Sequence, residues 1–149
     1  MQNIKNYYQV NEYLGTSGQP HNHDFVKIAR AGYQIVINLA MPTSENALPN
    51  EGALVTALGM AYFHIPVVWE APRVEDVDLF FGVMQALSRQ KVWVHCALNM
   101  RVSCFVYLYQ KHVLGLPDEQ ARYPMNKIWQ PTGIWQDLID EVHQQRLVT

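Results

Sequence analysis

The chain has 149 residues, and 11 Lys and Arg against 13 Asp and Glu give a formal net charge of −2. The length suits one domain, and without repeats or linker-like stretches we expect a single domain over residues 1–149. The near-neutral charge offers no basic surface for nucleic acid or anionic lipid, and no run reaches the roughly 18 apolar residues of a membrane span. Two cysteines and a polar start without an apolar signal-peptide core lead us to expect a reducing, cytoplasmic setting.

Strands and helices are predicted to alternate along the chain. β-Forming residues around Gly15 predict one or two edge strands between Tyr7 and Ser17. A helix capped by Asn22 follows, and the β-branched run Tyr33–Leu39 is typical of a buried parallel strand. The later elements expected are a helix over 50–58, a buried strand over 61–67, a helix beginning near 75, a strand over 91–95, and helices over 101–115, 118–128 and 132–145.

This order of elements implies an α/β fold, with a mostly parallel sheet flanked by helices and a C-terminal helical tail. In such sheets ligands bind beyond the carboxyl ends of the strands. We therefore expect the functional residues near Ala40, near Trp69 and at Cys96, where three predicted strands end.

The segment Val92–Ser103 (VWVHCALNMRVS) carries the strongest local signal. A buried strand ends at Cys96, a short loop follows, and Arg101 opens an amphipathic helix. Backbone amides 97–101 would lack helical partners and could hold an anion in front of Cys96, while the helix dipole and Arg101 favour its thiolate. A nucleophile beside an anion cradle suits phosphoryl or sulfur transfer. A buried apolar cysteine followed by an exposed arginine is the simpler alternative.

Four segments occur in an order that resembles one enzyme superfamily. They are Thr16–Pro20 (TSGQP), Gly32–Leu39, Leu58–Val67 and His95–Arg101 (HCALNMR). The chain resembles the cysteine-dependent tyrosine and dual-specificity phosphatases, and more narrowly their compact bacterial beta-lactamase-hydrolase-like branch. The resemblance implies a tyrosine-phosphatase-like fold and a substrate that is a phosphorylated small molecule or phosphoprotein. It also implies phosphate or sulfate in the site, and no cofactor or metal.

The same resemblance assigns roles to the residues of the loop. Cys96 would be the nucleophile that forms a phosphocysteine, and Arg101 would bind the phosphoryl oxygens. His95 would tune the thiolate. The other phosphate-binding positions implied are Ala97, Leu98, Asn99, Met100 and Ser103.

Three departures from the phosphatase pattern keep other functions open. Four residues separate Cys96 from Arg101 where phosphatases have five, and four is the spacing of rhodanese-type sulfurtransferases. The loop has no glycine, so any positive φ would fall on a residue such as Asn99. Val102 replaces the usual hydroxyl residue, with Ser103 one place later. The alternatives are a sulfurtransferase that uses a Cys96 persulfide, and a catalytically weak oxyanion-binding module.

The general acid of such phosphatases is an Asp from a separate loop. Counting from Pro66, its position falls on Trp69, and Glu70 is the nearest carboxylate. Glu70 is therefore our candidate acid, although a solvated loop glutamate explains it equally well. Asp76 and Asp78 are weaker candidates, because they lie on the following helix.

The remaining polar and aromatic residues have structural explanations. Cys104 lies near the apolar stripe of its helix and is expected in the core, with a resolving-thiol role as the alternative. His64 is expected to be a hydrogen-bonded core histidine, and the histidine spacing indicates no metal site. Gln19 belongs to a turn but could approach the anion, and Trp129 and Trp135 are expected to anchor the helical tail. The oligomeric state stays open.

Overall fold

Short runs of β-forming residues pair into one sheet within residues 1–147, the part of the chain that the computed structural model describes. The strand order is β1-β2-β5-β3-β4, with β2, β5, β3 and β4 parallel and β1 antiparallel to β2. The strands are β1 (Tyr8–Asn11), β2 (Leu14–Ser17), β3 (Ile35–Asn38), β4 (Ala61–His64) and β5 (Val92–His95). The prediction of a mostly parallel sheet is confirmed.

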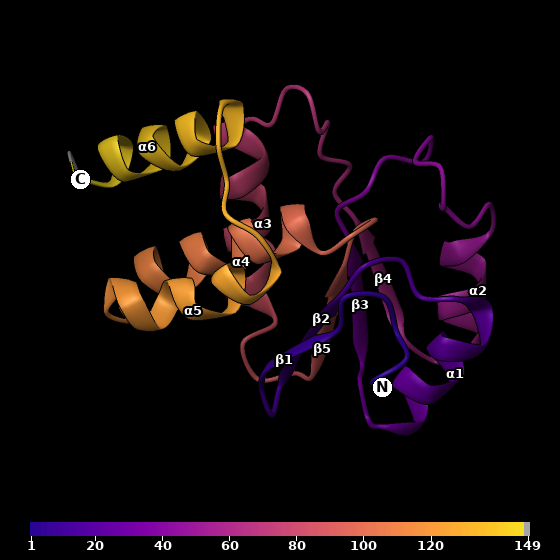
Figure 1. Ribbon diagram of the computed structural model, residues 1–149. Coiled ribbons are helices and arrows are strands. Elements are labelled where there is room, and N and C mark those ends of the chain that lie inside the picture. The colour runs from indigo at the N-terminus through magenta and orange to yellow at the C-terminus, as the bar shows by residue number, and fades with distance from the viewer. Residues whose placement is uncertain (148–149) are drawn as a thin grey trace.

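Helices cover both faces of this sheet (Figure 1). One layer contains α1 (Asn22–Arg30) and α2 (Glu51–Ala57). The opposite layer contains α3 (Val74–Ala86), α4 (Met100–His112), α5 (Asp118–Ile128) and the C-terminal helix α6 (Ile134–Leu147). None of the helices in this part of the chain combines the length and the apolar character needed to cross a bilayer.

The central strand β5 contributes to two separate hydrophobic cores because side chains alternate along a strand. Val92 and Val94 pack into the core beneath α3 to α6, whereas Trp93 packs with α1 and α2. The Trp93 ring also requires a glycine on the neighbouring strand. A Cβ atom at Gly15 would lie 2.5 Å from that ring, so any larger residue at Gly15 would displace it.

The segment Tyr7–Ser17 supplies one edge strand, in line with the expected one or two, because β2 lies between β1 and β5. One expectation about strand position is wrong. β4 pairs with β3 alone and is mostly exposed, because it forms the other edge of the sheet. His64 is therefore exposed, and the expectation that it lies in the core is wrong. The expectation that it is hydrogen-bonded is confirmed, because its Nε2 lies 2.7 Å from the Ala40 carbonyl oxygen.

Several helix boundaries differ from the predicted ones by one to three residues, and α4 ends at His112 rather than at 115. α1 begins at Asn22 rather than being capped by it, and His21 occupies the N-cap position. The cause is Asp24, whose carboxylate accepts a 2.9 Å hydrogen bond from the His21 amide and fixes the first turn. At the other end of the chain, α6 begins at Ile134, after Gly133 with its positive φ of 58°, and not at Thr132.

Candidate active site

The segment predicted to carry the chemistry lies at the carboxyl edge of the sheet, between β5 and α4. Cys96 is the first residue after β5 and is only 1% exposed, and α4 begins at Met100. The parallel neighbours of β5 end alongside it, because Ser17 of β2 and Asn38 of β3 both pair with His95. The predicted strand, short loop and helix are all present.

The carbonyl groups of this loop are held by donors from other parts of the chain. The Ala97 carbonyl accepts two hydrogen bonds and the Leu98 carbonyl accepts one, each from a segment outside the loop. The Cys96 carbonyl lies 3.1 Å from Nδ1 of His95. The outside donors are the Gln19 amide at 3.1 Å, Asn46 Nδ2 at 3.2 Å and Asn6 Nδ2 at 2.9 Å.

The amide groups of the same loop are unpaired. Within residues 1–147, no acceptor receives a hydrogen bond from the backbone N–H of any residue from 97 to 101. These residues precede and form the first turn of α4, where helix geometry leaves amides without partners and the helix dipole favours negative charge. Successive free amides of this kind form an anion-binding concavity.

Asn99 gives the loop its curvature. Its φ of 66° is left-handed, as we expected for a loop without glycine, and asparagine adopts this conformation more readily than most residues. The side chain is fully buried. Its Nδ2 donates to the Asn6 carbonyl at 2.8 Å and to Thr16 Oγ1 at 3.2 Å, so Asn99 offers an anion its backbone only.

A cavity of about 240 Å³ opens in front of the loop. Apolar side chains form one wall of it, and the Arg101 guanidinium lies 5.9 Å from the centre of the Trp69 ring. Nη1 of Arg101 donates to the Val67 carbonyl at 3.0 Å, while Nε and Nη2 have no acceptor in the described chain and remain available to an oxyanion. The lining residues are Trp69, Cys96, Ala97, Leu98, Met100 and Arg101.

Not every predicted site residue reaches this cavity. Glu70 is exposed in the turn after β4, and no acidic side chain belongs to the described lining. The Ser103 hydroxyl instead donates to the Met100 carbonyl at 3.1 Å and accepts from Trp129 Nε1 at 3.1 Å. The two weaker acid candidates are also engaged elsewhere, Asp76 with Arg73 at 3.0 Å and Asp78 with Arg146 at 3.5 Å.

Cys104 lies in the core beneath the sheet, as expected for a packing residue. It is fully buried on α4, and burial raises the pKa of its thiol far above the ordinary value. The tryptophans of the helical tail pack as expected too. Trp129 and Trp135 cluster with Trp69, and Trp135 Nε1 donates to the Trp69 carbonyl at 3.0 Å, so the tail supports the cavity wall.

A residue that sequence reasoning missed lies directly behind the loop. Glu51, the first residue of α2, is 4% exposed, and its Oε2 lies 2.6 Å from Nε2 of the fully buried His95. Burial raises the pKa of Glu51, but hydrogen bonds and charge from His95, with hydrogen bonds from Gln19 and Tyr62, bring it below the ordinary value. No sequence signal distinguished Glu51, because an acidic residue in a first helical turn already has an explanation.

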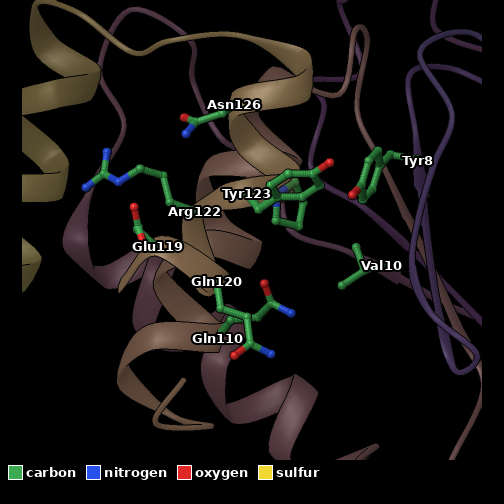
Figure 2. Close-up of a pocket in the computed structure, with 9 residues that line it drawn as sticks. Tyr8, Val10, Gln110, Glu119, Gln120, Arg122, Tyr123 and Asn126 are labelled. Atoms are coloured by element: carbon green, nitrogen blue, oxygen red, sulfur yellow. The ribbon is translucent and has the colours of Figure 1, made fainter. Parts of the chain in front are cut away.

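A larger cavity, of about 740 Å³, lies on another part of the molecule, between β1 and α5 (Figure 2). Tyr8 and Val10 of β1 face Tyr123 of α5 across it, and it contains neither cysteine. Within residues 1–147, no three His, Cys, Asp or Glu side chains are placed to share a metal ion. Cys96 and its cavity are therefore the candidate active site.

Comparison with known proteins identifies the family and the fold. No family model matches the chain. A crystal structure from Shewanella putrefaciens, described as a "Putative phosphatase (DUF442)", is 40% identical, with a TM-score of 0.86 over 97% of this chain and 95% of that one. The chain belongs to the DUF442 family. The match extends over nearly the whole length of both chains.

Other relatives of this DUF442 protein are more distant or much longer. Beta-lactamase hydrolase-like proteins from two strains of Xylella fastidiosa are 34% identical over 95 residues. That match spans 62% of this chain but only 22% of theirs. Two more distant structures share the fold. Tk-PTP in its active form is 18% identical, with a TM-score of 0.78 over 93% of this chain and 97% of that one. PTPMT1 in complex with PI(5)P is 14% identical, with a TM-score of 0.80 over 95% of this chain and 97% of that one. The fold is therefore tyrosine-phosphatase-like, as the sequence predicted.

Proposed function

We propose that this DUF442 protein is a cysteine-dependent phosphatase that hydrolyses a phosphomonoester through a phosphocysteine at Cys96. The observation that carries the proposal is the run of unpaired amides 97–101 beside the Cys96 side chain, with Arg101 at the same cavity. Phosphate oxygens are the acceptors that such donors fit. The description of the Shewanella relative and the phosphoinositide bound by PTPMT1 support the same class of substrate.

The reaction has two steps at one phosphorus atom. The Cys96 thiolate attacks phosphorus, an S–P bond forms, and the P–O bond to the leaving group breaks with its electron pair remaining on oxygen. Water then attacks phosphorus, the S–P bond breaks, and inorganic phosphate leaves with the thiolate restored. In both steps the free amides and Arg101 stabilise the negative charge on the equatorial oxygens.

The lining of the cavity favours aryl phosphates. No acidic side chain of the described chain lines it, and a phenolate can leave without prior protonation far more readily than an alkoxide can. The apolar wall formed by Trp69, Leu98 and Met100 also suits an aromatic ring. Glu70, exposed beside Trp69, is the acid we propose for leaving groups that need a proton.

The test compares p-nitrophenyl phosphate with an alkyl phosphate, in the wild-type protein and in Cys96→Ser. We expect turnover of the aryl phosphate, little turnover of the alkyl phosphate, and neither in the variant. Phosphate binding without any turnover by the wild-type protein would refute hydrolysis and favour an oxyanion-binding module.

The four-residue spacing and the acid-free lining favour a second candidate, a sulfurtransferase. The Cys96 thiolate would attack the outer sulfur of thiosulfate and release sulfite, which needs no general acid, to leave a persulfide on Cys96. Cyanide would then take the outer sulfur as thiocyanate and regenerate the thiolate. Thiocyanate production lost in Cys96→Ser, without phosphatase activity, would select this reaction.

A further inference from the structure

A buried polar network connects the carboxyl edge of the sheet to the residue that precedes the nucleophile. Glu51 is its centre, because each of its carboxylate oxygens accepts short hydrogen bonds from other elements. Oε1 accepts from Gln19 Nε2 at 2.6 Å, and Oε2 accepts from the Tyr62 hydroxyl at 2.9 Å and lies 2.6 Å from His95 Nε2. The turn after β2, strand β4 and strand β5 therefore meet at one carboxylate.

The His95 ring faces an acceptor at both nitrogens. Nε2 meets the Glu51 carboxylate, and Nδ1 lies 3.1 Å from the Cys96 carbonyl oxygen. A carbonyl oxygen can only accept, so Nδ1 carries a proton, and a carboxylate at 2.6 Å calls for a proton on Nε2 as well. Two protonated nitrogens make an imidazolium, whose charge in a fully buried position requires a counter-ion.

We propose that Glu51 is a positioning residue that holds His95 as an imidazolium bonded to the Cys96 carbonyl, and thereby favours the Cys96 thiolate. The proposal rests on the role of Cys96 as nucleophile. Nδ1 of the ring lies 3.1 Å from the Cys96 carbonyl oxygen and the Glu51 carboxylate meets the opposite nitrogen, so the imidazolium is the member of the pair nearer to the Cys96 backbone. Gln19 and Tyr62 hold the carboxylate in place.

Few other charges surround this pair. From α4, Arg101 lines the same cavity as Cys96, and from β4 the Tyr62 hydroxyl meets Glu51. Burial, then the carboxylate of Glu51, raise the pKa of Tyr62, so it stays a neutral donor at ordinary pH. From α1, Phe25 packs edge-on against His95 with ring centres 5.9 Å apart and adds no charge. Glu51 is therefore the group that balances His95.

Replacing the carboxylate by a neutral amide tests the proposal. Glu51→Gln keeps the shape of the side chain but removes the counter-ion, so His95 would lose a proton and one of its two hydrogen bonds. The readout is the rate of Cys96 alkylation by iodoacetamide as a function of pH, with the modified peptide identified by mass spectrometry. We expect the pH midpoint to rise by about one unit, a tenfold loss of rate below the midpoint.

A matched variant separates this role from loss of stability. Asp24→Asn removes a buried carboxylate that bonds to the His21 amide on α1, away from the loop. We expect this variant to keep the wild-type midpoint. A Glu51→Gln protein that melts lower but alkylates with the wild-type midpoint would overturn the proposal.

A second measurement needs no variant that could fail to fold. Long-range ¹⁵N NMR of the wild-type protein near pH 7 should show both ring nitrogens of His95 protonated, and a neutral tautomer would contradict the proposal. Neither readout depends on turnover. If the wild-type protein is an active phosphatase but Glu51→Gln keeps the wild-type midpoint, only the role of Glu51 is refuted. If Glu51→Gln shifts the midpoint but the wild-type protein hydrolyses no phosphate ester, only the proposed function is refuted.

Discussion

Gly18 and Ala97 touch across the gap between the turn after β2 and the Cys96 loop. A Cβ atom at Gly18 would lie 2.6 Å from the Ala97 carbonyl oxygen, and the next amide, that of Gln19, donates to the same oxygen at 3.1 Å. The turn therefore fixes the loop through a backbone contact that leaves no space for a side chain.

Gly18→Ala tests this contact. The added methyl group must push the Ala97 carbonyl away, and displacement of a catalytic loop by about 1 Å can cost about 100-fold in rate. We expect a large loss of kcat/KM for p-nitrophenyl phosphate with the fold retained by circular dichroism. Gly82→Ala on α3, where nothing lies within 4 Å, is the control and should be fully active. Unchanged activity in Gly18→Ala would show that the turn does not hold the loop.

Arg101→Lys tests the second half of the anion site. Lysine keeps the positive charge but cannot hold two phosphate oxygens with a planar fork, and it loses the bond to the Val67 carbonyl. Because a charged hydrogen bond contributes about 1.5–3 kcal/mol, we expect at least about tenfold weaker phosphate binding by calorimetry. Arg122→Lys, whose side chain pairs with Asp118, is the control. Equal affinity in both variants would place the phosphate away from Arg101.

Asn99 combines a left-handed backbone with a buried side chain, and two substitutions separate these contributions. Asn99→Gly keeps the backbone conformation but removes the bonds to Asn6 and Thr16. Asn99→Ala removes those bonds and adds the left-handed cost of about 1–2 kcal/mol. Urea denaturation should therefore show Asn99→Ala to be less stable than Asn99→Gly by about 1 kcal/mol. The reverse order would contradict the assigned strain.

A histidine pair on α4 and α6 predicts sensitivity to acid. His112 Nε2 and His143 Nδ1 lie 2.7 Å apart and can share only one proton. Burial, then the charges of His143 and Lys111, lower the pKa of His112 from 6.5 to about 4, and burial lowers that of His143. Between pH 6.5 and pH 4 these histidines bind more protons in the unfolded chain than in the folded one. Their contribution to the free energy of unfolding is therefore complete above pH 6.5 and declines as the pH falls toward 4.

Urea unfolding at several pH values checks this decline. In the double variant His112→Gln/His143→Gln the free energy of unfolding should depend less on pH between 6.5 and 4, whereas His21→Gln, at an exposed position, should keep the wild-type dependence. A double variant with the wild-type slope would assign the acid sensitivity to other groups.

Much of the fold, and the loop at the centre of the site, could be predicted from local sequence patterns. The β-branched run that ends at Cys96, followed by an arginine and an apolar stripe, is sufficient to place a strand, a loop and a helix. Because that loop has no glycine, we expected any positive φ to fall on a residue such as Asn99, and Asn99 has it. Both inferences depend only on residues that are neighbours in the chain.

Contacts between distant segments could not be predicted in the same way. Glu51 and His95 are 44 residues apart, and their pairing depends on how α2 packs at the end of the sheet. The position of β4 at the sheet edge depends on strand order, which its own hydrophobic run does not encode. The Ser103 hydroxyl accepts a hydrogen bond from Trp129, the residue that follows α5 and lies 26 positions later in the chain. Sequence spacing describes one element at a time, whereas the site is assembled from several.

The most direct test of the central claim is to trap the intermediate on Cys96. Acid quenching during turnover of p-nitrophenyl phosphate, followed by mass spectrometry of the Cys96 peptide, should show the mass of one added phosphoryl group. The adduct should be absent in Cys96→Ser. An added sulfur atom after incubation with thiosulfate, together with no phosphoryl adduct, would contradict the phosphatase and establish sulfur transfer instead.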